Sequence, residues 1–165
     1  MKRAILLRHA SAADARDDAL RELTAEGREQ AHTAGRRIAT LGAEWQPTRA
    51  LCSSALRTSA TLAGAREALG ALAAAELDAQ LYLANAPRLL AALQSVPDAS
   101  ACVLVVAHEP GLSDLARQLA RRGDPRTRQR LARGMTPGSF AALALDVASW
   151  RELRAGCGEL FAFEP

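Results

Sequence analysis

Short runs of apolar residues alternate along the chain with longer stretches in which apolar residues recur at helical spacing. The apolar runs predict strands at 4–7, 49–52, 76–81, 101–107, 139–147 and 159–163. The longer stretches predict helices at 25–41, 54–69, 87–93 and 112–121. The run at 101–107 is apolar at every position, which is typical of a central strand that is covered on both faces.

Turn and cap residues separate these segments. Thr24 precedes the first predicted helix as a cap, and Gly42 and Gly70 suit the ends of the first and second helices. The alternation predicts an α/β fold, a three-layer α/β/α sandwich with a mostly parallel central sheet and a hairpin-like end. Because the chain shows neither an internal repeat nor a linker, we expect a single domain over residues 1–165.

The composition narrows the class of protein. The chain has 165 residues, of which 49% are hydrophobic and 24% charged, and its formal charge is +3. These values argue against a membrane or a disordered protein. Lys2 is the one lysine among 21 basic residues, and the others are arginines. This bias is explained either by GC-rich codons or by arginines that recognise phosphate with two parallel hydrogen bonds.

The termini and cysteines bear on the compartment. The apolar run after Met1-Lys2-Arg3 ends at Arg8, which makes it too short for the core of a signal peptide. The three cysteines, Cys52, Cys102 and Cys157, are widely spaced and form no CxxC pair. Such a pattern favours reduced thiols over disulfides or a zinc site. We therefore expect a cytoplasmic protein.

Histidine and arginine residues follow three of the predicted strands. Arg8 and His9 end the first, His108 follows the run at 101–107, and Ser53 ends the second strand, with Arg57 shortly after it on the next helix. Ligands of open α/β sheets bind beyond the carboxyl ends of the strands, and helix N-termini favour anions. The set suits a phosphoryl group, although each residue taken singly also fits a structural histidine or a solvated arginine.

Four motifs in the same order resemble the histidine phosphatase superfamily, the phosphoglycerate mutase-like enzymes. They are LLRHA at 6–10 (Arg-His-Gly in most relatives), RELTAEGREQA at 21–31, SSALRTSATLA at 53–63 and VVAHEPGL at 105–112. Together they span residues 4 to 112, about two-thirds of the chain. The short length and the stretch from Tyr82 to Pro87 are similar to the small SixA-type phosphohistidine phosphatases. The resemblance implies the phosphoglycerate mutase-like fold.

The resemblance also implies roles for individual residues. His9 would be the nucleophile that takes the phosphoryl group, and Arg8, Arg57 and His108 would surround the phosphoryl oxygens. Water would then release phosphate from phospho-His9. Positioning and charge neutralisation supply most of the catalysis in phosphoryl transfer, so the resemblance implies neither a cofactor nor a metal. Ser53 and Glu109 are further candidates for binding the phosphate or the substrate.

One departure from the family pattern affects the substrate. Many relatives carry a glutamate general acid after the third strand, where this chain aligns Gln80, and neither Glu76 nor Asp78 matches the spacing. Glu109, directly after the second motif histidine, is either a residue that supports the site or a surface carboxylate. Without a general acid an alkyl phosphate is a poor substrate, whereas the imidazole of phosphohistidine leaves readily. We therefore expect the substrate to be phosphohistidine in a protein partner.

Alternative functions remain open at this point. One is a broad-specificity phosphomonoesterase of small molecules, although the alanine-rich segment between Leu69 and Glu76 leaves little room for a lid. Another is a non-catalytic module that binds phosphate or nucleic acid through the segment Arg117–Arg133, which carries seven arginines and one acid. Because that segment contains no aromatic residue for base stacking, nucleic acid is the less favoured partner. The same segment could instead dock an acidic phosphoprotein.

Overall fold

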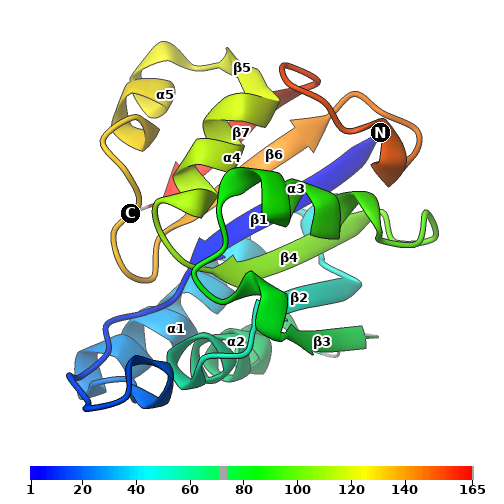
Figure 1. The fold of residues 1–165 in the computed structure, drawn as a ribbon. Coiled ribbons are helices and arrows are strands. Elements are labelled where there is room, and N and C mark those ends of the chain that lie inside the picture. Colours follow the sequence, from blue (N-terminus) through cyan, green and yellow to red (C-terminus); the bar gives the residue numbers. More distant parts are fainter. Residues whose placement is uncertain (71–73, 165) are drawn as a thin grey trace.

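A seven-stranded sheet forms the centre of the described part of the protein, residues 1–70 and 74–164 of a computed structural model (Figure 1). The strands are β1 (Lys2–Arg8), β2 (Arg49–Ser53), β3 (Ala74–Asp78), β4 (Cys102–Ala107), β5 (Ala120–Gly123), β6 (Phe140–Leu145) and β7 (Gly158–Glu164). Their order in the sheet is β3-β2-β4-β1-β6-β7-β5. β1 to β4 are parallel, whereas β6 is antiparallel to β1 and β7. The predicted, mostly parallel α/β fold is confirmed.

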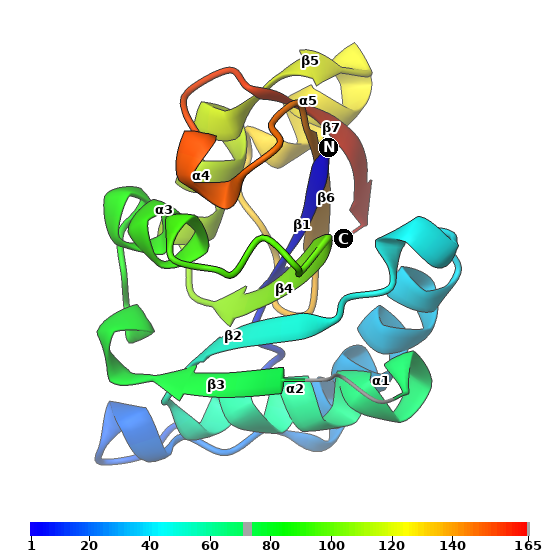
Figure 2. The ribbon, with the colours of Figure 1, turned by 90° about the vertical axis from the view of Figure 1, so that its right-hand side faces the viewer.

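Helices cover both faces of the sheet (Figure 2). They are α1 (Ala25–Ala39), α2 (Leu56–Leu69), α3 (Ala86–Gln94), α4 (Gly111–Leu119) and α5 (Pro125–Leu131). α1 and α2 pack together on one face, and α3 and α4 lie on the other. None of the helices in the described residues is long and apolar enough to cross a membrane.

The buried strand β4 shows why the sheet takes this central position. Val103 and Val105 belong to the core that contains α3 and α4, whereas Leu104 and Val106 belong to the core that contains α1 and α2. Successive side chains of a strand point to opposite faces, so an uninterrupted apolar run fills two cores at once. This confirms the prediction that the run forms a central strand.

The predicted ends of the first two helices agree closely with the structure. Thr24 caps α1, because its side-chain oxygen accepts a hydrogen bond from the amide of Gly27 at 2.9 Å. Gly70, at φ +73°, ends α2. Residues 71–73, inside the alanine-rich segment that we discussed as too short for a lid, lie outside the described residues.

Two predicted boundaries are wrong. The strand predicted at 76–81 ends at Asp78, because the Asp78 carboxylate accepts a hydrogen bond from the Gln80 amide and starts a 3₁₀ turn over Ala79–Leu81. The helix predicted to reach residue 121 ends at Leu119, since Ala120 begins β5 and pairs with β7. In both cases a hydrogen bond outside the periodic pattern decides where the element ends.

Candidate active site

The carboxyl ends of β1, β2 and β4 lie side by side in the sheet and bring two histidines together. His9 follows β1 and His108 follows β4, and their ring centroids are 5.3 Å apart. Ser53 ends β2, where its hydroxyl lies 2.7 Å from Nε2 of His108. All three side chains are buried. The structure thus assembles at one edge of the sheet the residues that the sequence placed at strand ends.

His9 is held in a single tautomer. Its Nδ1 lies 2.9 Å from the carbonyl oxygen of Ala10, which can only accept a hydrogen bond, so Nδ1 carries the proton. Burial, assisted by the positive charges of Arg57 and Arg8, lowers the pKa of His9 to about 4. The ring is therefore neutral at pH 7. Its Nε2 lone pair has no hydrogen-bond partner among the described residues.

His108 is also a neutral ring, and its tautomer is the opposite one. Nη2 of Arg57 lies 3.3 Å from Nδ1 of His108, and a guanidinium can only donate. The proton of the neutral ring is therefore on Nε2, which donates to the Ser53 hydroxyl. Burial lowers the pKa of His108 to about 3, and the charge of Arg57 acts in the same direction.

Arg57, on the first turn of α2, is only 2% exposed. Its Nη1 donates to the Asp18 carbonyl at 2.6 Å, and its Nη2 donates to the Asp18 carboxylate at 3.0 Å. The hydroxyl of Tyr82 donates to the same carboxylate oxygen at 2.5 Å. Arg57, Asp18 and Tyr82 therefore form a hydrogen-bonded network that contacts His108.

Arg8, the residue directly before His9, is held by the loop that follows α5. Its Nη1 donates to the carbonyl of Met135 at 2.5 Å. Glu109 supports that loop, because its carboxylate accepts hydrogen bonds from the Met135 amide and from the Ser113 hydroxyl. Glu109 is therefore not a free surface carboxylate. Within the described residues it forms no hydrogen bond to His9 or His108, but it supports the Met135 backbone, whose carbonyl accepts the hydrogen bond from Arg8.

Both site arginines keep a donor without an acceptor. Within the described residues, Nε of Arg8 and Nε of Arg57 are buried and have no hydrogen-bond partner. A buried N–H without an acceptor is costly, and a ligand that supplies the acceptor removes this cost. Two such donors beside two neutral imidazoles are suited to the oxygens of a phosphoryl group or another oxyanion.

The motif around α1 fixes the loop that leaves His9. The amide of Thr24 donates to the Ser11 carbonyl, and the Ser11 amide donates to the Gln30 side chain at 2.9 Å. A Cβ at Gly27 would lie 2.0 Å from the Ser11 carbonyl oxygen, so only glycine allows this approach. The three motif residues Thr24, Gly27 and Gln30 thus contact Ser11 and fix the backbone shortly after His9.

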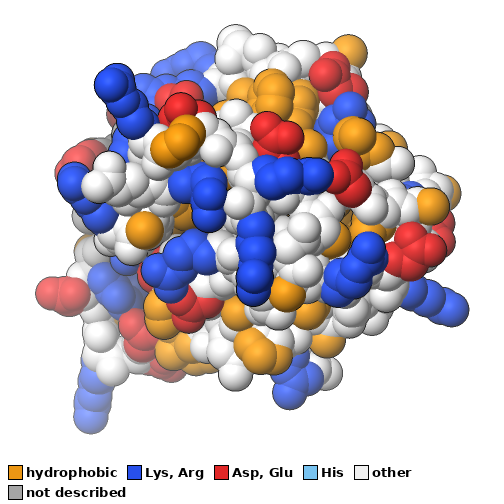
Figure 3. Space-filling model, turned by 90° about the horizontal axis from the view of Figure 1, so that it is seen from above, with side chains coloured by type: hydrophobic (Ala, Val, Ile, Leu, Met, Phe, Trp, Pro, Cys, Tyr) orange, Lys and Arg blue, Asp and Glu red, His pale blue; other side chains and the backbone are white. Residues whose placement is uncertain are grey.

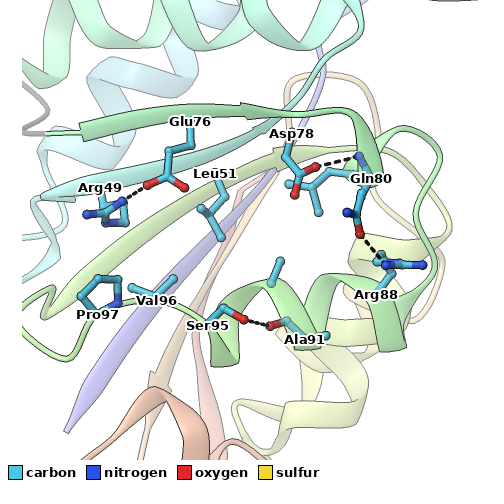
Figure 4. A pocket seen from close by; sticks show the side chains of 12 residues that line it. Arg49, Leu51, Glu76, Asp78, Gln80, Arg88, Ala91, Ser95, Val96 and Pro97 are labelled. Atoms are coloured by element: carbon cyan, nitrogen blue, oxygen red, sulfur yellow. Dashed lines mark hydrogen bonds and ion pairs between the residues drawn. The ribbon is translucent and has the colours of Figure 1, made fainter.

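Gln80, which aligns with the general acid of relatives, and the nearby carboxylates Glu76 and Asp78 lie away from the two histidines. Gln80 accepts a hydrogen bond from Arg88 at 2.5 Å, Asp78 accepts from the Gln80 amide, and Glu76 pairs with Arg49. All of them line a groove of about 520 Å³ between β3 and α3 (Figure 4). Among the described residues, their hydrogen-bond partners Arg49 and Arg88 lie in this groove and not at His9 or His108.

The basic segment Arg117–Arg133 is partly neutralised. Arg117 pairs with Asp114, and Arg122 pairs with Asp146. Figure 3 views the molecule from the end that carries β5 and α5, and on this face basic side chains are interspersed with acidic ones. The structure therefore gives no continuous basic surface on that face that would favour nucleic acid.

Sequence reasoning missed two residues of the site, Asp18 and Tyr82. Asp18 lies in a 3₁₀ turn three residues before Arg21 of the second motif, and Tyr82 follows the 3₁₀ turn after β3. The available signals were that spacing and the Tyr82–Pro87 stretch that resembles SixA-type proteins. In the described residues no three His, Cys, Asp or Glu side chains form a cluster that could hold a metal.

Several solved structures share this fold over nearly the full chain. A protein from Nakamurella multipartitia that is described as a phosphohistidine phosphatase SixA is 29% identical to this chain, with a TM-score of 0.86. The match covers 99% of this chain and 95% of that one. The protein histidine phosphatase SixA complexed with tungstate is 25% identical, with a TM-score of 0.75 and coverages of 98% and 95%. No protein-family model and no curated protein matches the chain.

The chain belongs to the histidine phosphatase superfamily. A more distant structure, a mycobacterial glucosyl-3-phosphoglycerate phosphatase, is 18% identical with a TM-score of 0.65, covers 98% of this chain and 97% of that one, and shows the shared fold alone. This histidine phosphatase is an enzyme of the phosphatase class, as the sequence motifs indicated.

Proposed function

We propose that this histidine phosphatase hydrolyses phosphohistidine in a protein partner, without a metal, through a phosphoryl group carried on His9. The observation that carries the proposal is the state of the His9 ring. With the proton on Nδ1 and a pKa of about 4, Nε2 offers a lone pair at neutral pH. A neutral imidazole is a competent nucleophile for phosphoryl transfer.

The reaction would proceed in two balanced steps. The ring of the substrate phosphohistidine first takes a proton from water on its other nitrogen; Nε2 of His9 then attacks phosphorus, the P–N bond of the substrate breaks, and the substrate leaves as a neutral imidazole that keeps this proton. Water then attacks phospho-His9, its P–N bond breaks, and inorganic phosphate leaves while His9 returns to the neutral ring. His108, whose pKa burial lowers to about 3, is expected to gain a proton more readily beside the bound dianion.

Arg8 and Arg57 would supply the positive charge that this transfer requires. Each guanidinium is fixed by protein acceptors and retains a buried Nε–H without a partner. Placed donors stabilise the charge of the transition state without further reorganisation. The tungstate complex of a 25% identical SixA protein supports oxyanion binding by this fold.

The identity of the leaving group supports a phosphohistidine substrate. Gln80, which aligns with the usual general acid, is neutral and hydrogen-bonded to Arg88. Loss of a general acid costs about 10²- to 10⁴-fold in rate when the leaving group is a basic alkoxide. A protonated imidazole needs no such help. The 29% and 25% identical relatives are also named as SixA phosphatases.

The covalent intermediate can be trapped. The wild-type protein, incubated with a phosphohistidine protein and quenched rapidly, should carry acid-labile, alkali-stable phosphate, and His9→Ala should carry none and lose turnover. His32→Ala, which removes a histidine of α1 outside the site, is the matched control and should behave like the wild type. Normal turnover by His9→Ala would disprove the mechanism.

The substrate class needs a separate comparison. We expect kcat/KM for a phosphohistidine protein to exceed that for a sugar phosphate by at least about 10²-fold, the lower bound for a missing general acid. A preference for the sugar ester would favour the small-molecule phosphatase instead. It would leave the role of His9 untouched, because the trapping experiment tests that role independently.

A further inference from the structure

The Asp18 carboxylate joins three segments that are distant in sequence. It lies in the loop between β1 and α1, binds Arg57 of α2, and accepts the hydroxyl of Tyr82, which precedes α3. We propose that Asp18 and Tyr82 are positioning residues that set the direction in which the Arg57 guanidinium meets the phosphoryl group. This inference rests on the proposed function and assigns to it two residues that the motifs leave without a role.

The hydrogen bonds of Arg57 to the protein involve its two Nη atoms and leave Nε–H for a ligand. Nη1 donates to the Asp18 carbonyl at 2.6 Å, and Nη2 is shared between the Asp18 carboxylate at 3.0 Å and Nδ1 of His108 at 3.3 Å. The group is planar and rigid, so fixing both Nη atoms also fixes the direction of Nε–H. That Nε–H is the donor that lacks a partner.

Tyr82 is the third member of this network and binds the Asp18 carboxylate. Its hydroxyl donates to Oδ2 of Asp18 at 2.5 Å, the oxygen that also accepts from Arg57. Its ring meets the ring of His108 edge-on at 5.6 Å and lies 5.9 Å from the guanidinium carbon of Arg57. Tyr82 thus contacts the arginine, its carboxylate partner and the second site histidine at once.

The backbone around Tyr82 is held in an unfavourable conformation. Leu83 has a φ of +50°, in the left-handed region that non-glycine residues rarely adopt. The next residue, Ala84, is pinned by the start of α4, since a Cβ at Gly111 would lie 2.0 Å from the Ala84 carbonyl oxygen. Strain that is maintained by close packing next to a site points to a positioning role for Tyr82.

Asp18 is anchored independently of Arg57. Nη1 of Arg21 donates to Oδ1 of Asp18 at 3.4 Å, while Nε and Nη2 of Arg21 donate to the carbonyls of Ala13 and Ala12. The hydrogen bond from Tyr82, together with Arg57, lowers the pKa of Asp18 to about 2. The carboxylate is therefore ionised and its turn is fixed, so that it can hold Arg57 in place.

A competing interpretation makes the opposite prediction about binding. If the Asp18 carboxylate only occupied the place of a phosphoryl oxygen, its removal would tighten the binding of oxyanions. If it positions Arg57, its removal weakens binding and slows transfer together. Tungstate affinity separates the two, and because it requires no turnover it remains informative even if the proposed phosphatase reaction fails.

The experiment uses Asp18→Asn, Tyr82→Phe and the double variant, each measured for tungstate affinity and for kcat/KM with a phosphohistidine protein. We expect each single variant to lose about 10-fold in both, the scale of one hydrogen bond to a charged group, and the double variant to lose less than the product. Asp146→Asn, which breaks the surface pair with Arg122 at the far end of the sheet, is the matched control and should lose nothing.

A background without Arg57 tests whether the two residues act through it. In Arg57→Ala, the further change Tyr82→Phe should leave kcat/KM unaltered. An equal loss in that background, or a tighter tungstate complex in Asp18→Asn, would overturn the proposal. Thermal unfolding of each variant shows that the fold is retained.

Tyrosine absorbance gives a readout that does not depend on activity. Tyr82 is the one tyrosine of the chain, so tyrosinate absorbance reports this side chain alone. The hydrogen bond to Asp18 raises the pKa of Tyr82, while Arg57 opposes the rise and His108 faces the ring. Asp18→Asn should lower the titration midpoint; an unchanged midpoint would show that the contact does not persist in solution, against the proposal.

Discussion

Positively charged side chains lie at both ends of strand β1, but the two ends differ in whether the N–H donors of these side chains have acceptors. At the amino end, Lys2 is 6% exposed, and its ammonium group donates to the carbonyls of Asp98 and Ser100 and pairs with the Asp98 carboxylate at 3.6 Å. At the carboxyl end, Arg57 is also buried and Arg8 is partly buried, and within the described residues each keeps a buried Nε–H without an acceptor.

The difference shows that burial of a charge does not by itself mark a functional site. A buried cation whose donors are all satisfied stabilises the fold, while a buried cation with an unused donor carries a desolvation cost that a ligand can offset. Burial also lowers the pKa of both site histidines, so the site combines buried neutral rings with arginine donors that a ligand can use. Each prediction below changes one side of this comparison.

The largest effect should come from replacing one buried cation at each end by a methionine. Arg57→Met should lower kcat/KM by at least about 10²-fold, the cost of one donor that stabilises transition-state charge. Lys2→Met should leave kcat/KM within about twofold and lower the free energy of unfolding by about 1–3 kcal/mol, because it removes hydrogen bonds to a buried charge.

Steady-state kinetics and urea unfolding on the same preparations test this pair. The comparison fails if Lys2→Met loses activity in proportion to Arg57→Met. It also fails if Arg57→Met destabilises the protein more than Lys2→Met, since the unsatisfied guanidinium is expected to contribute less to folding than the satisfied ammonium group.

Sequence patterns predicted the strand ends well because burial and side-chain period determine them. His9 and His108 come together as a consequence of sheet order, and a sequence can indicate this through apolar runs followed by polar residues. Asp18 could not be found in this way, because it lies in an aperiodic loop and its partners Arg57 and Tyr82 are 39 and 64 residues away. The motif resemblance indicated Arg57 as a site residue, but the hydrogen bonds from Arg57 to Asp18 became evident only in the folded structure.

The next effect concerns stability and pH. The pKa of His9 is about 4 and that of His108 about 3 in the folded protein, against an ordinary value of 6.5. Between pH 6.5 and 4 the unfolded chain binds protons that the folded chain does not, so the free energy of unfolding falls as the pH falls. Each histidine contributes a slope of up to about 1.4 kcal/mol per pH unit.

Urea unfolding at several pH values checks this sign and its origin. His108→Gln should remove about half of the slope that the two histidines contribute between pH 6.5 and 4, because one of the two titrating rings is gone. Stability that rises toward pH 4 would contradict the burial of neutral rings at the site.

The smallest effect should come from Glu109, which acts on Arg8 only through the loop between them. Its carboxylate accepts from the Met135 amide at 3.2 Å, and the Met135 carbonyl in turn accepts from Arg8. Glu109→Gln keeps one oxygen acceptor, so we expect kcat/KM to fall by only about threefold, less than a full hydrogen bond is worth. Glu109→Ala removes both acceptors and should cost more, whereas Ser113→Ala, which removes only the other partner of the carboxylate, should cost least. Equal losses of kcat/KM in all three variants would mean that Glu109 does not position Arg8 through the Met135 loop. Arg8 at the carboxyl end of β1 would then be positioned without Glu109, as Lys2 at the amino end is positioned by its own hydrogen bonds.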